Sequence, residues 1–269
     1  VVGLMNVQFA VKNDQIYIIE VNPRASRTVP FVAKATDSAI ASIAARVMAG
    51  EKLNSFKKRE SYGSVSYGET IPLADPMSLA SPMLPWFSVK EAVMPFARFP
   101  GVDTILGPEM RSTGEVMGWD RDFGRAFLKA QIGAGMKLPR KGCVFFSIKD
   151  KDKNDNLAET AQRLIKLGFN IIATRGTSAF LKEKNIPCKQ VNKVYEGRPN
   201  IVDTMKNGEI DLVMNTTEGL QAVKDSREIR SVALYDKIPY FTTAAAAHAA
   251  ALAIQSQNEG DIEVKSLQN

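Results

Sequence analysis

Short apolar runs alternate with amphipathic segments in the second half of the chain, from about residue 140 onward. Leu157, Ala161, Leu164 and Ile165 recur at helical spacing and would form one buried stripe. The pattern predicts strands at residues 143–148, 169–174, 189–191, 211–215 and 239–241, and helices at about 156–167, 178–184, 200–206, 219–224, 226–236 and 244–255. Strands that alternate with helices indicate an α/β fold, here a doubly wound parallel sheet with helices on both faces.

The first 140 residues carry a different pattern. Apolar and polar residues alternate on both sides of Asn13 and Asp14, which is typical of an antiparallel hairpin with a tight turn. Ile40, Ile43 and Val47 lie at helical spacing and indicate a helix. The elements predicted here are strands at residues 5–11 and 15–21, and helices at 36–50 and about 122–132. The pattern of this part therefore predicts an antiparallel hairpin followed by helices.

Stretches rich in glycine and proline separate these elements. Both residues favour turns, so we expect irregular structure or loops there. The irregular stretches are residues 51–88, 95–101 and 106–115. The apolar period is lost again at 133–140, which predicts a boundary between a domain at residues 1–138 and a domain at residues 139–269.

Composition narrows the class of protein. The 269 residues are 45% hydrophobic and 24% charged, which suffices for sizeable cores and excludes a disordered or collagen-like chain. Two cysteines and one histidine exclude a disulfide framework and multi-histidine metal chemistry, and they fit the reducing cytoplasm.

The net charge of +6 is spread along the chain. Residues 1–140 hold 17 Lys and Arg against 13 Asp and Glu, and the remainder holds 18 against 16. Neither part is a basic domain, so we expect no nucleic-acid partner.

One uncharged stretch, residues 238–258, is long enough to span a bilayer. It is mostly alanine and lacks the density of leucine, isoleucine and phenylalanine that a membrane span requires, so we expect no membrane partner. The chain begins with strand-like residues and without an initiator methionine. We therefore expect it to be a fragment of something larger.

The first group of residues with chemical potential lies in the predicted hairpin. Glu20 and Asn22 are two apart on a strand, so their side chains point to the same face. A carboxylate beside an amide oxygen forms a pair of hard ligands suited to Mg²⁺. A three-residue turn would pair Lys12 with Ile16 and place Gln8 opposite Glu20, whereas a two-residue turn would place Gln8 opposite Ile19. We predict the three-residue turn.

Two guanidinium groups, those of Arg24 and Arg27, follow directly and suit phosphate or carboxy-phosphate oxygens. An alternative stays open on spacing alone. Glu20 would then pair with Arg24 or Arg27 in a buried ion pair that has no role in catalysis.

The second group lies where the predicted parallel strands end. Ligands of open parallel sheets bind beyond the carboxyl ends of the strands, and polar residues gather there repeatedly. The polar segments are residues 150–153, 174–177, 192–193, 215–219 and 242–243. Thr174, Arg175, Gly176 and Thr177 precede a helix and form a good anion cradle. The alternative for any one loop is ordinary helix capping by threonine and solvated surface lysines.

Three motifs carry a resemblance to a known family. They are EVNPRASRTVPFVAKAT at residues 20–36, SVKE at 88–91 and GPEMRSTGEVMG at 107–118. With Gln8 twelve residues before Glu20, these motifs resemble the large-subunit family of carbamoyl phosphate synthases. The resemblance runs over essentially the whole chain and is weakest at about 51–84. It implies the end of a second ATP-grasp synthetase half, followed by a methylglyoxal-synthase-like allosteric domain.

The resemblance implies roles for the hairpin residues. Gln8, Glu20 and Asn22 would hold the Mg²⁺ or Mn²⁺ ions that bridge the phosphates of ATP, with Gln8 and Glu20 also contacting the nucleotide. Arg24 and Arg27 would be catalytic, stabilising charge as the γ-phosphoryl group moves to carbamate. Without the rest of the large subunit and the small glutamine amidotransferase subunit, we expect the fragment to be inactive. The family is cytoplasmic and serves pyrimidine and arginine biosynthesis.

The resemblance also implies two regulatory sites. The second domain of that family binds nucleotide effectors, with uridine monophosphate as inhibitor and inosine monophosphate as activator. The matching positions are Lys153, Thr174, Thr177, Lys193, Asn215 and Thr217, with Lys151 as a substitute for Lys153. An ornithine site at the interdomain junction would use Glu91, Met94, Asp225 and Thr242.

Two other hypotheses about the function stay open on the sequence. A true methylglyoxal synthase would need a catalytic aspartate in the loop after the strand at 211–215, where this chain has Asn215, Thr216, Thr217, Glu218 and Gly219. A stand-alone nucleotide-binding regulatory module would fit the second domain. Calorimetry with nucleoside monophosphates discriminates this module from a protein that binds no effector.

Overall fold

The computed structural model describes residues 1–36, 38–56, 86–94 and 114–264. The chain forms two compact units, one of residues 1–86 with 264–269, and one of residues 87–263. Most of the expected irregular stretch at 51–88, and those at 95–101 and 106–115, lie outside the described residues. The domain boundary at 138 and 139 stays a prediction.

The first unit begins with a hairpin of β1 (Asn6–Lys12) and β2 (Gln15–Asn22). Two helices follow, α1 (Thr28–Ala35) and α2 (Ile40–Met48), and then a 3₁₀ turn, η1 (Leu53–Ser55). The prediction of one helix at 36–50 is therefore wrong at its start. Thr36 ends α1, and its hydroxyl donates to the carbonyl of Val32 at 2.7 Å. Pro30 stands in the first turn of α1, where a helix tolerates proline.

The hairpin register confirms that Gln8 lies opposite Glu20, but the predicted three-residue turn is wrong. Gln8 faces Glu20 as expected, but Lys12 pairs with Gln15 through a two-residue turn. Asn13 and Asp14 both have positive φ, 50° and 59°, as a type I′ hairpin turn requires. The register shifts between Gln8 and Phe9, so one extra residue of β2 forms a β-bulge there. That bulge, not a longer turn, brings Gln8 opposite Glu20.

The second unit begins with a hairpin that the sequence pattern did not predict. It pairs β3 (Phe87–Val93) with β4 (Gly114–Asp120), and α3 (Phe123–Gly133) follows as expected. The Asp122 carboxylate caps α3 by accepting from the backbone N–H of Arg125 at 2.8 Å. A Cβ at Gly118 would lie 1.9 Å from the carbonyl oxygen of Ala126. Glycine at this position therefore lets α3 lie directly on the hairpin.

The expected parallel sheet follows and is confirmed. Its order is β7-β6-β5-β8-β9, and all neighbours are parallel. The strands are β5 (Gly142–Ser147), β6 (Phe169–Thr174), β7 (Lys189–Val191), β8 (Leu212–Asn215) and β9 (Tyr240–Phe241). The connecting elements are η4 (Asp150–Asp152), α4 (Asp155–Lys166), α5 (Arg175–Glu183), α6 (Ile201–Lys206), α7 (Leu220–Asp225), α8 (Arg227–Tyr235) and α9 (Ala244–Glu259).

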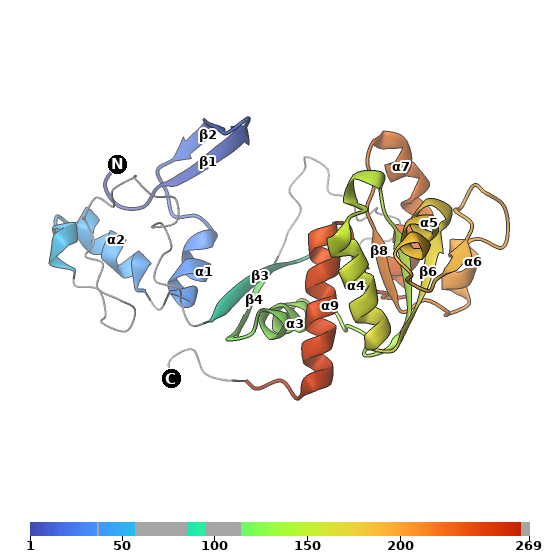
Figure 1. Cartoon of the computed structure of the whole chain (residues 1–269). Coiled ribbons are helices and arrows are strands. Elements are labelled where there is room, and N and C mark those ends of the chain that lie inside the picture. Colours follow the sequence, from blue (N-terminus) through green and yellow to red (C-terminus); the bar gives the residue numbers. More distant parts are fainter. Residues whose placement is uncertain (37, 57–85, 95–113, 265–269) are drawn as a thin grey trace. The chain divides into compact units, whose positions relative to one another are not determined.

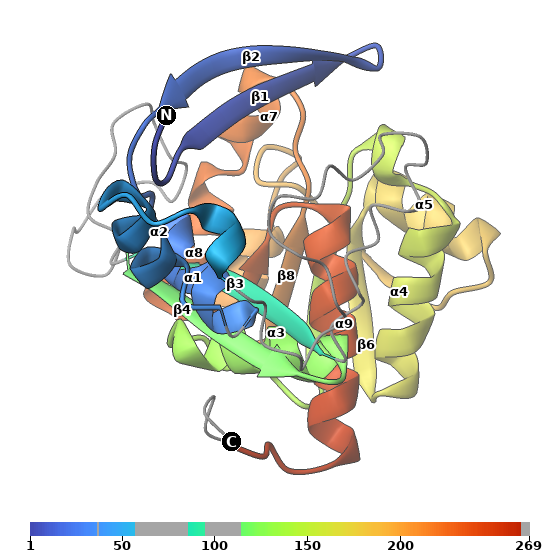
Figure 2. The same ribbon diagram turned by 90° about the vertical axis from the view of Figure 1, so that its left-hand side faces the viewer.

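Helices cover both faces of this sheet (Figure 1). On one face, Val144 and Phe146 of β5 share a buried core with residues of α4, α5 and α9. On the other, Phe145 shares a core with residues of α6 and α8. Figure 2 looks toward the face covered by α4 and α9. In the predicted stripe of α4, Leu157, Ala161 and Leu164 are buried, and Ile165 packs partly buried against them.

Among the described residues, no helix is both long and apolar enough to cross a membrane.

Candidate functional site

A cavity of about 870 Å³ opens in the second unit at the carboxyl ends of the parallel strands. The strand order changes direction at β5, because the chain moves outward to β6 and β7 and then returns to β8. Such a switch point leaves a crevice between the loops, and open α/β sheets bind ligands there. The cavity volume lies in the range typical of small-molecule sites.

The predicted effector residues meet in this cavity. All six line it, and they come from the ends of β5, β6, β7 and β8 and the loops or helix starts that follow them. Thr174 and Asn215 are the last residues of β6 and β8, and Thr177 lies in the first turn of α5. These residues are Lys153, Thr174, Thr177, Lys193, Asn215 and Thr217, and the proposed substitute Lys151 lines the cavity too. The fifth polar segment, residues 242–243 after β9, is different. The Thr243 hydroxyl caps α9 by accepting from the N–H of Ala246 at 3.1 Å. Capping is therefore the role that the structure shows for that segment.

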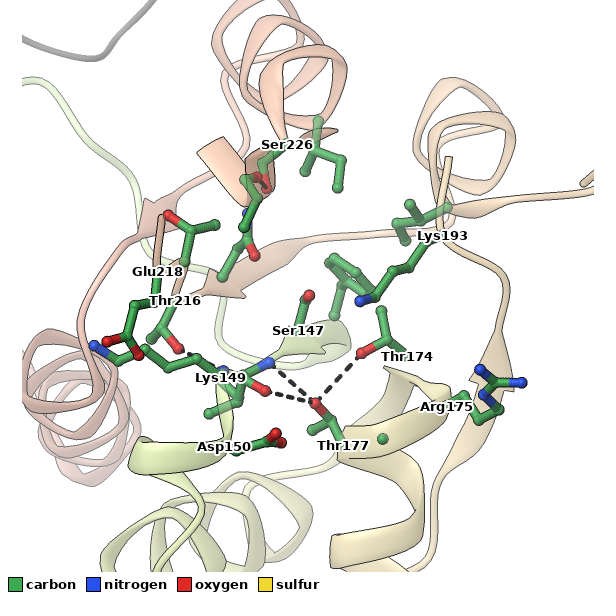
Figure 3. A pocket seen from close by; sticks show the side chains of 18 of the residues that line it. Ser147, Lys149, Asp150, Thr174, Arg175, Thr177, Lys193, Thr216, Glu218 and Ser226 are labelled. Atoms are coloured by element: carbon green, nitrogen blue, oxygen red, sulfur yellow. Dashed lines mark hydrogen bonds between the residues drawn. The ribbon is translucent and has the colours of Figure 1, made fainter. Parts of the chain in front are cut away.

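Two buried threonines hold the segment after β5 between its neighbours. The Thr177 hydroxyl accepts from the N–H of Ile148 at 3.0 Å and from the Thr174 hydroxyl at 3.3 Å (Figure 3). On the other side, the Thr216 hydroxyl accepts from the N–H of Lys149 at 3.0 Å. These bonds fix the backbone on both sides of the switch point, so the cavity is preformed.

The lining is mixed in charge but positive overall. Five lysines or arginines face three carboxylates, which leaves a net charge of +2. These residues are Lys149, Lys151, Lys153, Arg175 and Lys193 against Asp150, Glu196 and Glu218. In Figure 3, Lys193 reaches toward Thr174, whereas Arg175 points away from the centre. An anion of small or moderate size suits such a site.

Two of the lysines already have carboxylate partners. Lys151 Nζ lies 2.5 Å from Glu218 Oε1, and this bond raises the pKa of the lysine and lowers the pKa of the glutamate. Lys153 Nζ lies 2.5 Å from Asp150 Oδ1, and the lysine lowers the pKa of the Asp150 carboxyl. The Asn215 amide donates to the Tyr240 hydroxyl at 2.6 Å, which ties the end of β8 to β9.

An apolar wall completes the cavity, and sequence reasoning missed it. The wall is formed by Phe145, Val194, Ile201, Ala222 and Ile229, with the hydroxyl-bearing Ser226 among them. Phe145 and Ile201 are fully buried. The sequence contains one indication of this wall. Phe145 lies between Val144 and Phe146 on a strand, so its side chain faces the opposite side of the sheet from theirs. A flat, apolar group attached to an anion would fit this combination of walls.

The hairpin group lies in the first unit. Gln8 faces Glu20 across the strands, and the Asn22 amide donates to Glu20 Oε1 at 2.9 Å. Glu20, Arg24 and Arg27 are all exposed, so the structure does not show the alternative of a buried ion pair. The Arg24 guanidinium contacts the carbonyl of Ala25 at 3.5 Å, and Arg27 stands directly before α1. The oxygen ligands that the sequence predicted thus share one face of the hairpin.

The four residues predicted for ornithine come from different elements of the second unit. Glu91 lies on β3, Met94 follows it, Asp225 ends α7 and Thr242 follows β9. The Glu91 carboxylate accepts from Gln131 Nε2 at 3.0 Å. Burial raises the pKa of Glu91, and the bond from Gln131 partly offsets this. A common ligand for these four residues stays a prediction.

Fold and cavity define the class of the second unit as an open α/β domain with a positively charged crevice at the carboxyl ends of its strands. Comparisons with known proteins give one family match in each unit. Residues 156–242 match the family model described as MGS-like domain, and residues 1–56 match the one described as carbamoyl-phosphate synthase L chain, ATP binding domain.

The relatives are carbamoyl phosphate synthase large chains. The chain is 51% identical over 267 residues to that of Rhizobium meliloti strain 1021, covering 99% of this chain and 22% of the relative. Identity is 52% over 268 residues for Pasteurella multocida (99% and 23%) and 46% over 268 residues for Archaeoglobus fulgidus (100% and 23%). The chain thus spans about a fifth of the length of these relatives. The resemblance expected from the three motifs is confirmed.

Proposed function

We propose that the chain is the part of a glutamine-dependent carbamoyl phosphate synthase large subunit that binds nucleotide effectors and completes the second ATP site. The cavity of the second unit takes a nucleoside monophosphate. The hairpin of the first unit contributes to phosphorylation of carbamate. The rest of the large subunit and a small amidotransferase subunit are the partners, and the cytoplasm is the location.

The observation that carries the effector role is the convergence of six predicted side chains, from four strand ends and the segments that follow them, on one cavity. The lysines and the start of α5 suit the phosphate, since cations and helix N–H groups both favour an anion. The apolar wall suits a nucleobase, because Val194 and Ala222 are partly exposed in it and the buried Phe145 and Ile201 support it from behind. A stand-alone regulatory module would bind in the same way, so the ligase role rests on the hairpin and on the relatives.

The hairpin supports the role in ATP use through its ligand types. Glu20 and Asn22 present a carboxylate and an amide side by side, and Gln8 faces them. These are oxygen ligands of the kind that Mg²⁺ or Mn²⁺ takes, so the residues fit such an ion. The ion would neutralise charge on the phosphates of ATP. Arg24 and Arg27 are exposed beside this group, where they would bind and orient the oxygens of carbamate or of the transferred phosphoryl group.

Calorimetry on the 269-residue chain tests the effector role. We expect uridine and inosine monophosphates to bind, and the corresponding nucleosides to bind far more weakly. Lys193→Ala should weaken monophosphate binding roughly tenfold or more, because it removes a charge-assisted contact to phosphate. Lys182→Ala is the matched control, since Lys182 is an exposed lysine of α5 outside the cavity lining. Absence of binding, or equal affinities for wild type and Lys193→Ala, would contradict the proposal.

A further inference from the structure

Lys153, one of the proposed phosphate ligands, has its ammonium group occupied by a carboxylate of the same loop. Its Nζ lies 2.5 Å from Asp150 Oδ1. The Lys153 side chain is only 15% exposed, whereas the Asp150 side chain is 95% exposed. The ammonium also lies against the start of α5, because a Cβ built on Gly176 would be 3.1 Å from Nζ. Lys153 is therefore held at the helix start, with Asp150 on its solvent side.

Asp150 differs from the two other carboxylates of the cavity lining. Glu196 accepts the backbone N–H of Lys193 at 2.9 Å, and Glu218 binds Lys151. Asp150 instead pairs with Lys153, a proposed phosphate ligand, and this pair, together with the weaker influence of the Lys193 charge, lowers the pKa of its carboxyl. A carboxylate bound to the Lys153 ammonium beside the start of α5 occupies the kind of position that a phosphate group would take.

We propose that Asp150 is a built-in competitor for the phosphate position of this site. This inference rests on the proposed function. A phosphate monoester that binds Lys153 must displace the Asp150 carboxylate, because two anions cannot share the ammonium without repulsion. A phosphate dianion offers more charge and more acceptor oxygens than a carboxylate and can displace it. The competitor thus selects phosphate monoesters over singly charged carboxylates.

The opposite role for Asp150 makes a contrary prediction. If Asp150 serves only to position Lys153 for the ligand, its removal weakens binding. If it competes, its removal strengthens binding. Asp150→Asn keeps the size of the side chain and removes the charge, so the direction of the change discriminates the two roles.

Calorimetry on the 269-residue chain measures this direction. We expect Asp150→Asn to bind inosine monophosphate and inorganic phosphate about threefold to tenfold more tightly, the range set by losing one exposed ion pair and one repulsion. Affinity for inosine should not change, and binding of acetate should become measurable or stronger. Asp150→Glu keeps the anion and should remain near wild type.

Two further variants exclude a general charge effect. Asp155→Asn is the matched control, because Asp155 is also exposed, pairs with Lys184 at 2.6 Å and lies outside the cavity lining. It should leave the affinities unchanged. In a Lys153→Met background, Asp150→Asn should lose most of its gain.

The outcomes separate this inference from the proposed function. Wild-type chain that binds no monophosphate contradicts both. Wild-type binding with an unchanged or weakened Asp150→Asn variant contradicts only the role of Asp150. A gain of equal size in Asp155→Asn, or an undiminished gain in the Lys153→Met background, would also overturn it, because the effect would then be long-range.

Discussion

The two principal sheets of this chain are built from similar residues and differ in what covers them. In the parallel sheet, Val144, Phe145 and Phe146 are fully buried, because crossover helices lie on both faces. In the β1–β2 hairpin, apolar side chains stay in solvent on both faces of the strands. Ile16, Ile18 and Ile19 are 63–70% exposed.

The comparison shows that connectivity, not strand composition, supplies the cover. Parallel strands require long crossover connections, and the helices of those connections bury the sheet. A hairpin needs only a turn and brings no cover of its own, and a two-stranded sheet alone is marginally stable. The parallel sheet of the proposed effector unit is therefore buried by helices of the same unit. The proposed catalytic hairpin depends on contacts beyond those that the described residues supply.

The largest effect that would sharpen this contrast is a loss of catalysis from a hairpin substitution. In a full-length carbamoyl phosphate synthase large chain carrying these residues, Glu20→Gln should lower carbamate phosphorylation roughly a thousandfold, because it removes a carboxylate that neutralises charge near the transferred group. The measurement is ATP synthesis from carbamoyl phosphate and ADP. Bicarbonate-dependent ATP hydrolysis in the other half is the internal control and should persist. If both partial reactions survive, the assignment of Glu20 is wrong.

The same contrast explains how far the sequence alone predicts this structure. The strand and helix order of residues 142–259 follows from the sequence pattern, because strands such as β5 and β6 are largely apolar and helices such as α4 and α8 are amphipathic. The β3–β4 hairpin was missed, since its partners are separated by residues 94–113 and no tight turn marks it. Helix α1 (Thr28–Ala35) was missed as well, since it has only 8 residues and carries Pro30 in its first turn.

The candidate site divides in the same way. Residues at the ends of strands, such as Thr174 and Asn215, could be predicted, because the carboxyl ends of parallel strands lie at one edge of the sheet. The partners of Lys151 and Lys153 could not, since ion pairs depend on side-chain geometry within loops. The β-bulge beside Gln8 was also hidden, because the continuous apolar run of residues 16–19 in β2 gives no alternation from which the register could be read.

The next largest effect is on stability, and it compares truncation of a buried side chain with truncation of an exposed one. Leu164 is fully buried in α4, and Ile18 of β2 is 65% exposed. Leu164→Ala should lower the free energy of unfolding of the second unit by about 3 kcal/mol, through lost burial and a cavity. Ile18→Ala should change the free energy of unfolding by less than about 0.5 kcal/mol. Urea unfolding followed by far-ultraviolet circular dichroism measures both, and equal losses would refute the contrast in cover.

The smallest expected effect comes from the turn of the hairpin. Asp14 has φ of 59°, a left-handed conformation that glycine adopts without steric cost. Asp14→Gly creates the Asn-Gly pair preferred in type I′ turns and should stabilise the hairpin by about 0.5 kcal/mol, after allowing for the greater freedom of glycine in the unfolded chain. Amide exchange at Ala10 and Tyr17 should slow about twofold, because pairs alternate along an antiparallel ladder and this is the next hydrogen-bonded pair after Lys12 and Gln15 at the turn.

A glycine control separates turn geometry from added flexibility. Gln15→Gly places the same residue one position further, in β2, where extended backbone gives glycine no advantage. Exchange at the same amides should then become faster. Because this hairpin is uncovered on both faces, its local stability should follow turn chemistry in both variants. If neither variant alters exchange, contacts other than the turn determine the stability of the hairpin. The inference that this stability does not depend on packing would then be wrong.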